Sequence, residues 1–198
     1  MINLLATSLP KEASPECGWQ QAYLLSRYSD TTVLKACWDQ LIKKENPSSS
    51  LILATALIGV KAEGVSALSS IHQAISAPNK ENSNFFETQV IGMLGAWLLD
   101  NTNVKNHQAV LEFTRWQQGR LREEGLSAVS RYVVLGDLPI ITDIFLHEED
   151  PRAQYACIQS LGTLYEMTST IPTYSVFMQK RDALVAQWKK IIQSPPAP

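Results

Sequence analysis

The stretch that decides the fold runs from Leu138 to Gly162 and reads LPIITDIFLHEEDPRAQYACIQSLG. Its first nine residues are mostly apolar, and from Arg152 onward small or apolar residues recur at every third or fourth position. That spacing is typical of one face of an α-helix. The intervening His-Glu-Glu-Asp-Pro favours a turn, because proline suits the first turn of a helix but cannot continue one. The stretch therefore predicts two helices joined by a short turn.

Stripes with helical spacing recur along the chain from Cys17 onward, and no comparable stretch alternates with the period of two typical of strands. Segments rich in Pro, Gly, Asn, Asp and Ser separate the stripes and indicate helix ends and turns. We therefore expect an all-α protein of about nine or ten helices. The expected helices are Cys17–Tyr28, Thr31–Lys44, Ser49–Ala62, Val65–Ser76, Phe85–Asp100, Val104–Gly119, Leu121–Leu135, Leu138–His147, Arg152–Met167 and Tyr174–Gln193.

The chain has 198 residues, of which 45% are apolar and 18% are charged. A chain of this size buries one continuous core without metals or disulfides. We expect a single helical repeat domain over residues 1–198, with an N-terminal arm at 1–16 and a proline-rich tail at 194–198. The helices Cys17–Tyr28 and Tyr174–Gln193 are expected to act as end caps.

A weak internal repeat accompanies the helices. An aliphatic residue followed by glycine occurs at Gly59, Gly95, Gly136 and Gly162, at spacings of 36, 41 and 26 residues. A small residue late in a helix lets the next helix pair approach closely, so that stacked pairs bury a shared face. The alternative is chance, since leucine and glycine are common residues.

The segment from Leu138 to Glu166 resembles one repeat of the HEAT family. In that family a helix ends in an Asp-Pro turn, and a second helix carries a valine–arginine pair, small residues and Leu-Gly. The residues that fit this pattern are Asp150, Pro151, Cys157, Ile158, Leu161 and Gly162. Gln154 departs from it, because it stands where the family's arginine pairs with the turn aspartate, and Arg152 lies two residues away.

The resemblance implies an irregular, HEAT-like α-solenoid of about four stacked antiparallel helix pairs. Its right-handedness follows from the resemblance alone. Repeats of this type span about 40 to 47 residues. The match is good over about 29 residues and weaker elsewhere, because the segment from Asn84 to Gly95 keeps the apolar register without the turn signature.

Charge and hydropathy argue against two classes of partner. The chain has 17 basic and 19 acidic residues, a net charge of −2, whereas nucleic-acid binders usually carry a basic excess. The longest apolar run, Leu51–Val60, is about half the length needed to cross a bilayer. No basic residue precedes the apolar start of the chain, which argues against a secretory signal. We therefore expect a cytoplasmic protein that binds neither nucleic acid nor membrane.

The sequence holds no motif that indicates catalysis, a cofactor or a metal. The three cysteines, Cys17, Cys37 and Cys157, are widely spaced and form no CxxC pair. His147 and the three acids that follow it have the residue types of metal ligands, but consecutive residues at a helix end point in different directions. Gly92 and Gly95 form a GxxG inside an apolar helix, which is typical of helix packing. We expect no catalytic, cofactor-binding or metal-binding residues.

One segment carries the residue types typical of a protein-binding site. Arg115, Trp116, Arg120 and Arg122 fall within eight residues, across an expected corner between two helices. Arginine and tryptophan are enriched at binding hot spots. Alternatively, Trp116 belongs to the core with Ala109 and Phe113, while Arg120 and Arg122 are solvated or pair with Glu123 and Glu124.

An acidic run lies further along the chain. Five acids and no lysine or arginine lie between Asp137 and Asp150. Such a run is usually a solvated face. In a solenoid, however, turns line one edge, and adjacent basic and acidic edges would orient a partner electrostatically.

These observations favour a non-catalytic protein-binding module, an adaptor or scaffold, whose binding surface is the exposed side of the second helices with the Arg115–Arg122 corner at its margin. The partner's identity and the oligomeric state are left open. One alternative is a toxin-neutralising or effector-inhibiting (immunity) protein, in which a mildly acidic helical domain plugs a partner's active site. The other is a HEAT-like nucleic-acid-binding protein, against which the net charge of −2 argues.

Overall fold

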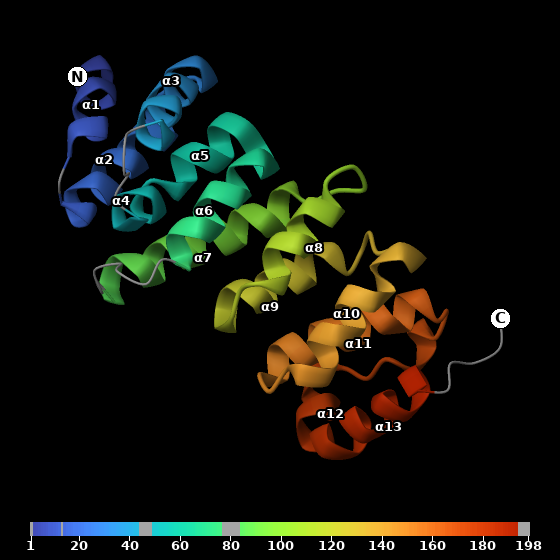
Figure 1. Ribbon diagram of the computed structural model, residues 1–198. Helices are drawn as coiled ribbons and strands as arrows, with labels where there is room; N and C mark the ends of the chain where they lie inside the picture. The colour runs from blue at the N-terminus through green and yellow to red at the C-terminus, as the bar shows by residue number, and fades with distance from the viewer. Residues whose placement is uncertain (1, 13, 44–48, 77–83, 194–198) are drawn as a thin grey trace. The chain divides into compact units, whose positions relative to one another are not determined.

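The structure is a computed structural model that describes residues 2–12, 14–43, 49–76 and 84–193 (Figure 1). All regular structure within these residues is helical, which confirms the all-α prediction. The proline-rich tail at 194–198 and the polar segment at 77–83 lie outside the described residues. The helices are α1 (Ile2–Ser8), α2 (Pro15–Tyr28), α3 (Thr31–Ile42), α4 (Ser49–Ala54), α5 (Ala56–Glu63), α6 (Leu68–Ile75), α7 (Asn84–Asn101), α8 (His107–Arg115), α9 (Gly119–Val129), α10 (Leu138–His147), α11 (Pro151–Leu164), α12 (Tyr174–Gln179) and α13 (Arg181–Gln193).

Side-chain caps fix the starts of several helices. The Ser14 hydroxyl accepts a hydrogen bond from the backbone N–H of Cys17 at the start of α2, and the Asp30 carboxylate does the same for Val33 in α3. Asp150 accepts from two N–H groups in the first turn of α11, where Pro151 occupies the first helical position. These caps satisfy donors that have no partner within the helix. The sequence therefore specifies these three starts locally.

The chain divides into two compact units, residues 1–97 and 98–198, and each is described by itself. In the first unit α3 packs against α5, α4 packs against α6, and α2 packs against both α4 and α5. The core of this unit includes the fully buried Leu25, Trp38 and Ile58. A Cβ on Gly59 would lie 2.7 Å from the Trp38 ring, so glycine is needed for α5 to approach α3.

In the second unit consecutive helices pack as neighbours, α8 with α9 and α10 with α11 (Figure 1). The second helix of each couple also packs on the next couple, since α9 contacts α11 and α11 contacts α12 and α13. The core between them includes the fully buried Phe145, Cys157, Leu161 and Phe177. This arrangement leaves the other face of α9 and α11 partly open to solvent.

Two of the expected helices are each broken into two. The stretch expected as Ser49–Ala62 breaks at Thr55, whose hydroxyl donates to the carbonyls of Leu51 and Ile52. Such back-bonding by threonine bends helices. The stretch expected as Tyr174–Gln193 breaks at Lys180, next to Arg181, which bonds to α11 and the turn before it. Tertiary contacts therefore decide the second break.

Several other expected helices differ from the structure at their boundaries, since Val104–Gly119 is observed as α8 (His107–Arg115) and Arg152–Met167 as α11 (Pro151–Leu164). The helix expected to reach Leu135 ends at Val129, so Gly136 lies in a 3-10 turn, η3 (Leu135–Asp137), with open space around it. Its expected role in close helix packing is therefore wrong. The expected N-terminal arm contains α1 and a 3-10 turn in which Leu9 is fully buried. None of the described helices has both the length and the apolar composition needed to cross a bilayer.

Candidate protein-binding site

The corner between α8 and α9 brings three of the four predicted binding residues together. The Arg115 guanidinium lies over the Trp116 ring, 5.0 Å from its centroid. Arg122 donates from Nη2 to the Arg115 carbonyl over 3.3 Å. Trp116 is 59% exposed, so its alternative assignment to the core is wrong, although Phe113 is buried as expected. An exposed tryptophan stacked with arginine presents a rigid amphipathic surface of the kind found at interfaces.

Arg120 and Arg122 each form an ion pair, but the two pairs differ in the exposure of the arginine and in the position of the glutamate. Arg120 Nε lies 2.7 Å from Glu124 Oε1, one turn along α9, and 60% of the Arg120 side chain is exposed. Arg122 Nη1 lies 2.7 Å from Glu148 Oε2, and both of these side chains are largely shielded from solvent. The expected pairing of Arg120 with Glu124 is thus found, whereas Arg122 pairs with Glu148. Arg122 therefore has a structural role whatever else it contacts.

Glu148 begins a chain of polar contacts along the second helices. Its backbone carbonyl accepts a 2.6 Å hydrogen bond from Gln154 Nε2 in α11. The Oε1 atom of Gln154 accepts a 2.9 Å bond from Arg181 Nε in α13, and Arg181 Nη2 also donates to the Glu149 carbonyl. Gln154, the departure from the HEAT pattern, thus links the turn before α11 to α13. Arg122, Glu148, Gln154 and Arg181 together connect α9, α11 and α13.

The acidic run from Asp137 to Asp150 is not a uniformly solvated face. Asp137 is buried, Glu148 is paired with Arg122, and Asp150 caps α11. Asp143 lies 3.8 Å from Arg115 Nη2 and remains half exposed. The expectation of a solvated acidic face therefore holds for Asp143 and Glu149, which are exposed, and is wrong for the other three acids, which bond to Arg122 or to backbone N–H groups.

Asp137 also forms a buried pair with His107, thirty residues earlier in the chain. The Nε2 atom of His107 lies 3.2 Å from Asp137 Oδ2, an ion-pair distance without hydrogen-bond alignment. The same oxygen accepts a 2.8 Å bond from the Val134 backbone N–H. The pair fixes η3 against the start of α8.

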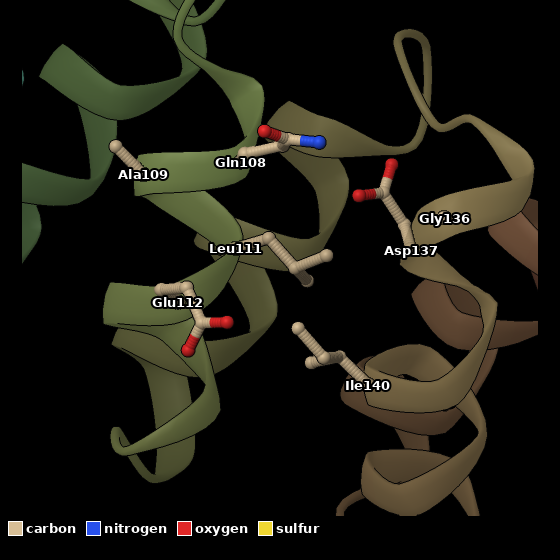
Figure 2. Close-up of a pocket in the computed structure, with 7 residues that line it drawn as sticks. All are labelled: Gln108, Ala109, Leu111, Glu112, Gly136, Asp137 and Ile140. Atoms are coloured by element: carbon tan, nitrogen blue, oxygen red, sulfur yellow. The ribbon is translucent and has the colours of Figure 1, made fainter.

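A cavity of about 360 Å³ lies between α8, η3 and α10. Its lining residues are Gln108, Ala109, Leu111, Glu112, Gly136, Asp137 and Ile140. In Figure 2 the side chains of Leu111 and Ile140 face one another across this space. The buried carboxylate of Asp137 is already engaged by His107 and Val134, so the polar side chains that the cavity still offers are those of Gln108 and Glu112.

A second cavity, of about 310 Å³, lies on the exposed side of the second helices. Glu123 and Ser127, four residues apart, present one face of α9 to it, and Tyr155 and Gln159 do the same from α11. Arg152 and the Tyr174 ring of α12 complete its lining. We call this space the α9–α11 groove. It combines aromatic walls with both signs of charge.

Aromatic packing and hydrogen bonding hold the walls of the α9–α11 groove in place. The rings of Tyr155 and Tyr174 meet edge to face at 5.3 Å, and Phe177 packs 5.4 Å from Tyr155. The Tyr155 hydroxyl donates a 2.8 Å hydrogen bond to the Pro172 carbonyl. Partial burial raises the pKa of Tyr155, so it remains a neutral donor at physiological pH. The groove is thus formed before any ligand arrives.

The charged groups of the α9–α11 groove are unequally accessible. Arg152 Nη1 lies 3.7 Å from Glu123 Oε2, with 64% of the arginine side chain exposed and 25% of the glutamate side chain exposed. Burial raises the pKa of Glu123, and Asp150 and Glu124 add to that effect while Arg152 opposes it. A hydrogen bond to Tyr174 raises the pKa of Arg152. The groove therefore presents a permanent cation beside a carboxylate whose charge is disfavoured.

Within the described residues, no three His, Cys, Asp or Glu side chains are placed to hold a metal ion. Cys17 is exposed, and the other two cysteines are buried. Burial raises the pKa of Cys37 to about 11 and raises that of Cys157 further above its ordinary value. Neither buried thiol is suited to act as a nucleophile.

Sequence reasoning did not identify the α9–α11 groove. Arg152, Tyr155 and Gln159 share the face of their helix opposite the apolar stripe, and that pattern was a usable signal. The sequence gives no such signal for Tyr174, because this residue follows the Ile171-Pro172 turn and reaches the groove only through the packing of α12 on α11. His107 and Asp137 likewise meet only in the fold.

Comparison of this chain with known protein-family models, with curated proteins and with solved structures finds no match.

Proposed function

We propose that this chain is a non-catalytic protein-binding module built of stacked helix pairs. The supporting observation is that α9 and α11, the second helices of two successive couples, pack together and expose a preformed groove with aromatic and charged walls. Grooves with rigid aromatic side chains and arginine suit protein recognition, because they bury large areas at low entropic cost.

The finer architecture belongs to the same proposal. In the second unit the couples α8–α9, α10–α11 and α12–α13 are antiparallel pairs stacked as an irregular HEAT-like α-solenoid. Two observations support this: the second helices contact one another in succession, and Arg122, Gln154 and Arg181 link them in series. Stacked pairs create an extended surface, which is the common binding feature of solenoid proteins.

The binding surface in this proposal has two parts on the second unit. One is the Arg115–Trp116 corner with Arg120, and the other is the α9–α11 groove. Trp116 contributes exposed apolar area, and Arg120 contributes an exposed cation whose partner lies on its own helix. Arg122 supports this surface from within through Glu148.

Quantitative affinity capture from the native cell, with the full chain as bait, tests the proposal. A Trp116→Ala, Arg120→Glu variant is expected to lose the captured partner. Arg131→Glu, at an exposed position in the turn after α9, introduces a matched charge reversal and is expected to retain it. Equal capture by all three baits would place the binding surface elsewhere.

Two further experiments with the full chain distinguish a scaffold from an inhibitor and from a nucleic-acid-binding protein. Rescue of a toxic partner on co-expression would show an inhibitor rather than a scaffold. Salt-dependent retention on DNA would show nucleic-acid binding, because the affinity of such proteins falls steeply with ionic strength. A scaffold shows neither behaviour.

A further inference from the structure

The α9–α11 groove offers an arriving ligand a cation more readily than an anion. Arg152 exposes 64% of its side chain there, whereas Glu123 exposes 25%. Their 3.7 Å separation is longer than a well-formed hydrogen bond between guanidinium and carboxylate. The guanidinium has five N–H donors, more than its contacts with Glu123 and Tyr174 use, so it can also bind a second carboxylate.

The carboxylate of Glu123 is a weak competitor for Arg152. Burial raises the pKa of Glu123, and the nearby Asp150 and Glu124 act in the same direction. A partner's carboxylate that keeps part of its contact with water avoids most of the burial cost that disfavours the charged form of Glu123. An external acidic group can therefore compete with Glu123 for Arg152.

Exposed apolar surface also lies on α12. Tyr174 forms one wall of the groove, and Met178, one helical turn further along α12 on the same face, is 45% exposed. A ligand that fits this surface carries an acidic group next to an apolar or aromatic side chain.

We propose that the α9–α11 groove binds a short acidic segment of a partner protein, with a carboxylate on Arg152 and an adjacent apolar or aromatic side chain against Tyr155 and Tyr174. This inference rests on the proposed function and names the chemistry of the partner segment. In this proposal Glu123 competes with the partner's carboxylate for Arg152. An ion pair with a purely structural role would not affect binding in this way.

The test is a nuclear magnetic resonance titration of the full chain with five-residue peptides whose ends are acetylated and amidated. The acidic probe has glutamate at positions two and four around a central phenylalanine, with alanine at both ends. The two comparison probes carry glutamine or lysine in place of glutamate. The acidic probe is expected to give saturable shifts in the amides of α9, α11 and α12, with weaker shifts for the glutamine probe and none for the lysine probe.

Substitutions in the chain give opposite expected effects. Arg152→Gln is expected to weaken binding of the acidic probe about tenfold, whereas Glu123→Gln is expected to strengthen it severalfold. Arg131→Gln, a matched loss of charge outside the groove, is expected to change nothing. Tyr174→Leu is expected to weaken binding, with Tyr28→Leu, an exposed tyrosine of the first unit, as its control. Unchanged amide spectra away from the groove show that each variant remains folded.

The proposal is overturned if the acidic probe gives no saturable shifts, if the lysine probe binds as well, or if Arg152→Gln binds like the unaltered chain. A rise in affinity in Arg152→Gln would also overturn it. In each case the protein-binding function remains separately testable, because affinity capture with the Trp116→Ala, Arg120→Glu variant reports on the corner between α8 and α9.

Discussion

Arg122 and Glu148, 26 residues apart in the chain, form an ion pair of 2.7 Å that joins α9 to the turn before α11. Both side chains are largely shielded, with 19% and 10% exposed. Arg122→Gln removes one partner and leaves the other carboxylate poorly solvated, so we expect the free energy of unfolding to fall by about 2 kcal/mol. Urea unfolding followed by circular dichroism measures this change.

Lys43→Gln is the control for that experiment. It removes an ion pair with Asp39 in which both side chains are more exposed, 74% for the lysine and 32% for the aspartate. Exposed pairs contribute little, so we expect a change within about 0.5 kcal/mol. If both variants lose equal stability, shielding is not what gives the Arg122 pair its effect.

Gly59 and Gly136 belong to the same weak sequence repeat but occupy different surroundings. A Cβ at position 59 would lie 2.7 to 2.9 Å from three ring atoms of Trp38. A Cβ at position 136 would have no neighbouring atom within 4 Å. We expect Gly59→Ala to destabilise the protein by roughly 1 to 3 kcal/mol. Gly136→Ala is expected to stay within about 0.5 kcal/mol. Thermal unfolding of the two variants distinguishes a packing role from chance recurrence, and equal effects would count against the packing role.

The three cysteines should differ sharply in reactivity. Cys17 is exposed, while burial raises the pKa of both Cys37 and Cys157 and so suppresses the reactive thiolate. We expect the folded protein to react rapidly with one equivalent of a thiol reagent such as DTNB, and the unfolded protein with three. Cys17→Ser should remove the rapid phase. Rapid reaction of a second thiol in the folded protein would contradict the burial described here.

Glu123 should make stability depend on pH in a direction opposite to that of most glutamates. Burial raises its pKa in the folded protein. Protonated Glu123 therefore favours the folded state. This contribution is fully present below the pKa of Glu123 in the unfolded chain, and it is lost as the pH rises through the pKa of Glu123 in the folded protein. We expect Glu123→Gln to melt at a higher temperature than the unaltered chain at pH 7, and the difference to shrink as the pH falls through the raised pKa.

The exposed Glu112→Gln on α8 is the control for the pH series, because it removes the same charge outside the α9–α11 groove. A lower melting temperature for Glu123→Gln than for the unaltered chain at pH 7 would mean that the ion pair with Arg152, rather than burial, dominates at this glutamate.

Local sequence signals predicted the parts of the fold that they control. The bounds of α10, and the start of α11 to within one residue, followed from the apolar spacing and from the Asp150-Pro151 turn, because cap and proline act within one helical turn. The breaks at Thr55 and Lys180 were not predicted. Thr55 lies in an uninterrupted apolar run, and Lys180 precedes Arg181, whose partners lie about thirty residues earlier.

The candidate site likewise has one part that the sequence predicted and one part that it did not. The Arg115–Trp116 corner was predicted from residue types that are adjacent in sequence, and the structure places the two side chains in contact. The α9–α11 groove was missed because Glu123, Arg152 and Tyr174 come from three separate helices. Their meeting depends on how α9, α11 and α12 pack, and no local pattern encodes that packing.

The most direct measurement of the central claim is hydrogen–deuterium exchange of the full chain with and without the partner recovered by affinity capture. The account predicts slower exchange on binding in α9 and α11, with the strongest protection in segments that line the α9–α11 groove or carry Trp116. Protection confined to helices of the first unit, or a complex with no change in α9 and α11, would contradict it.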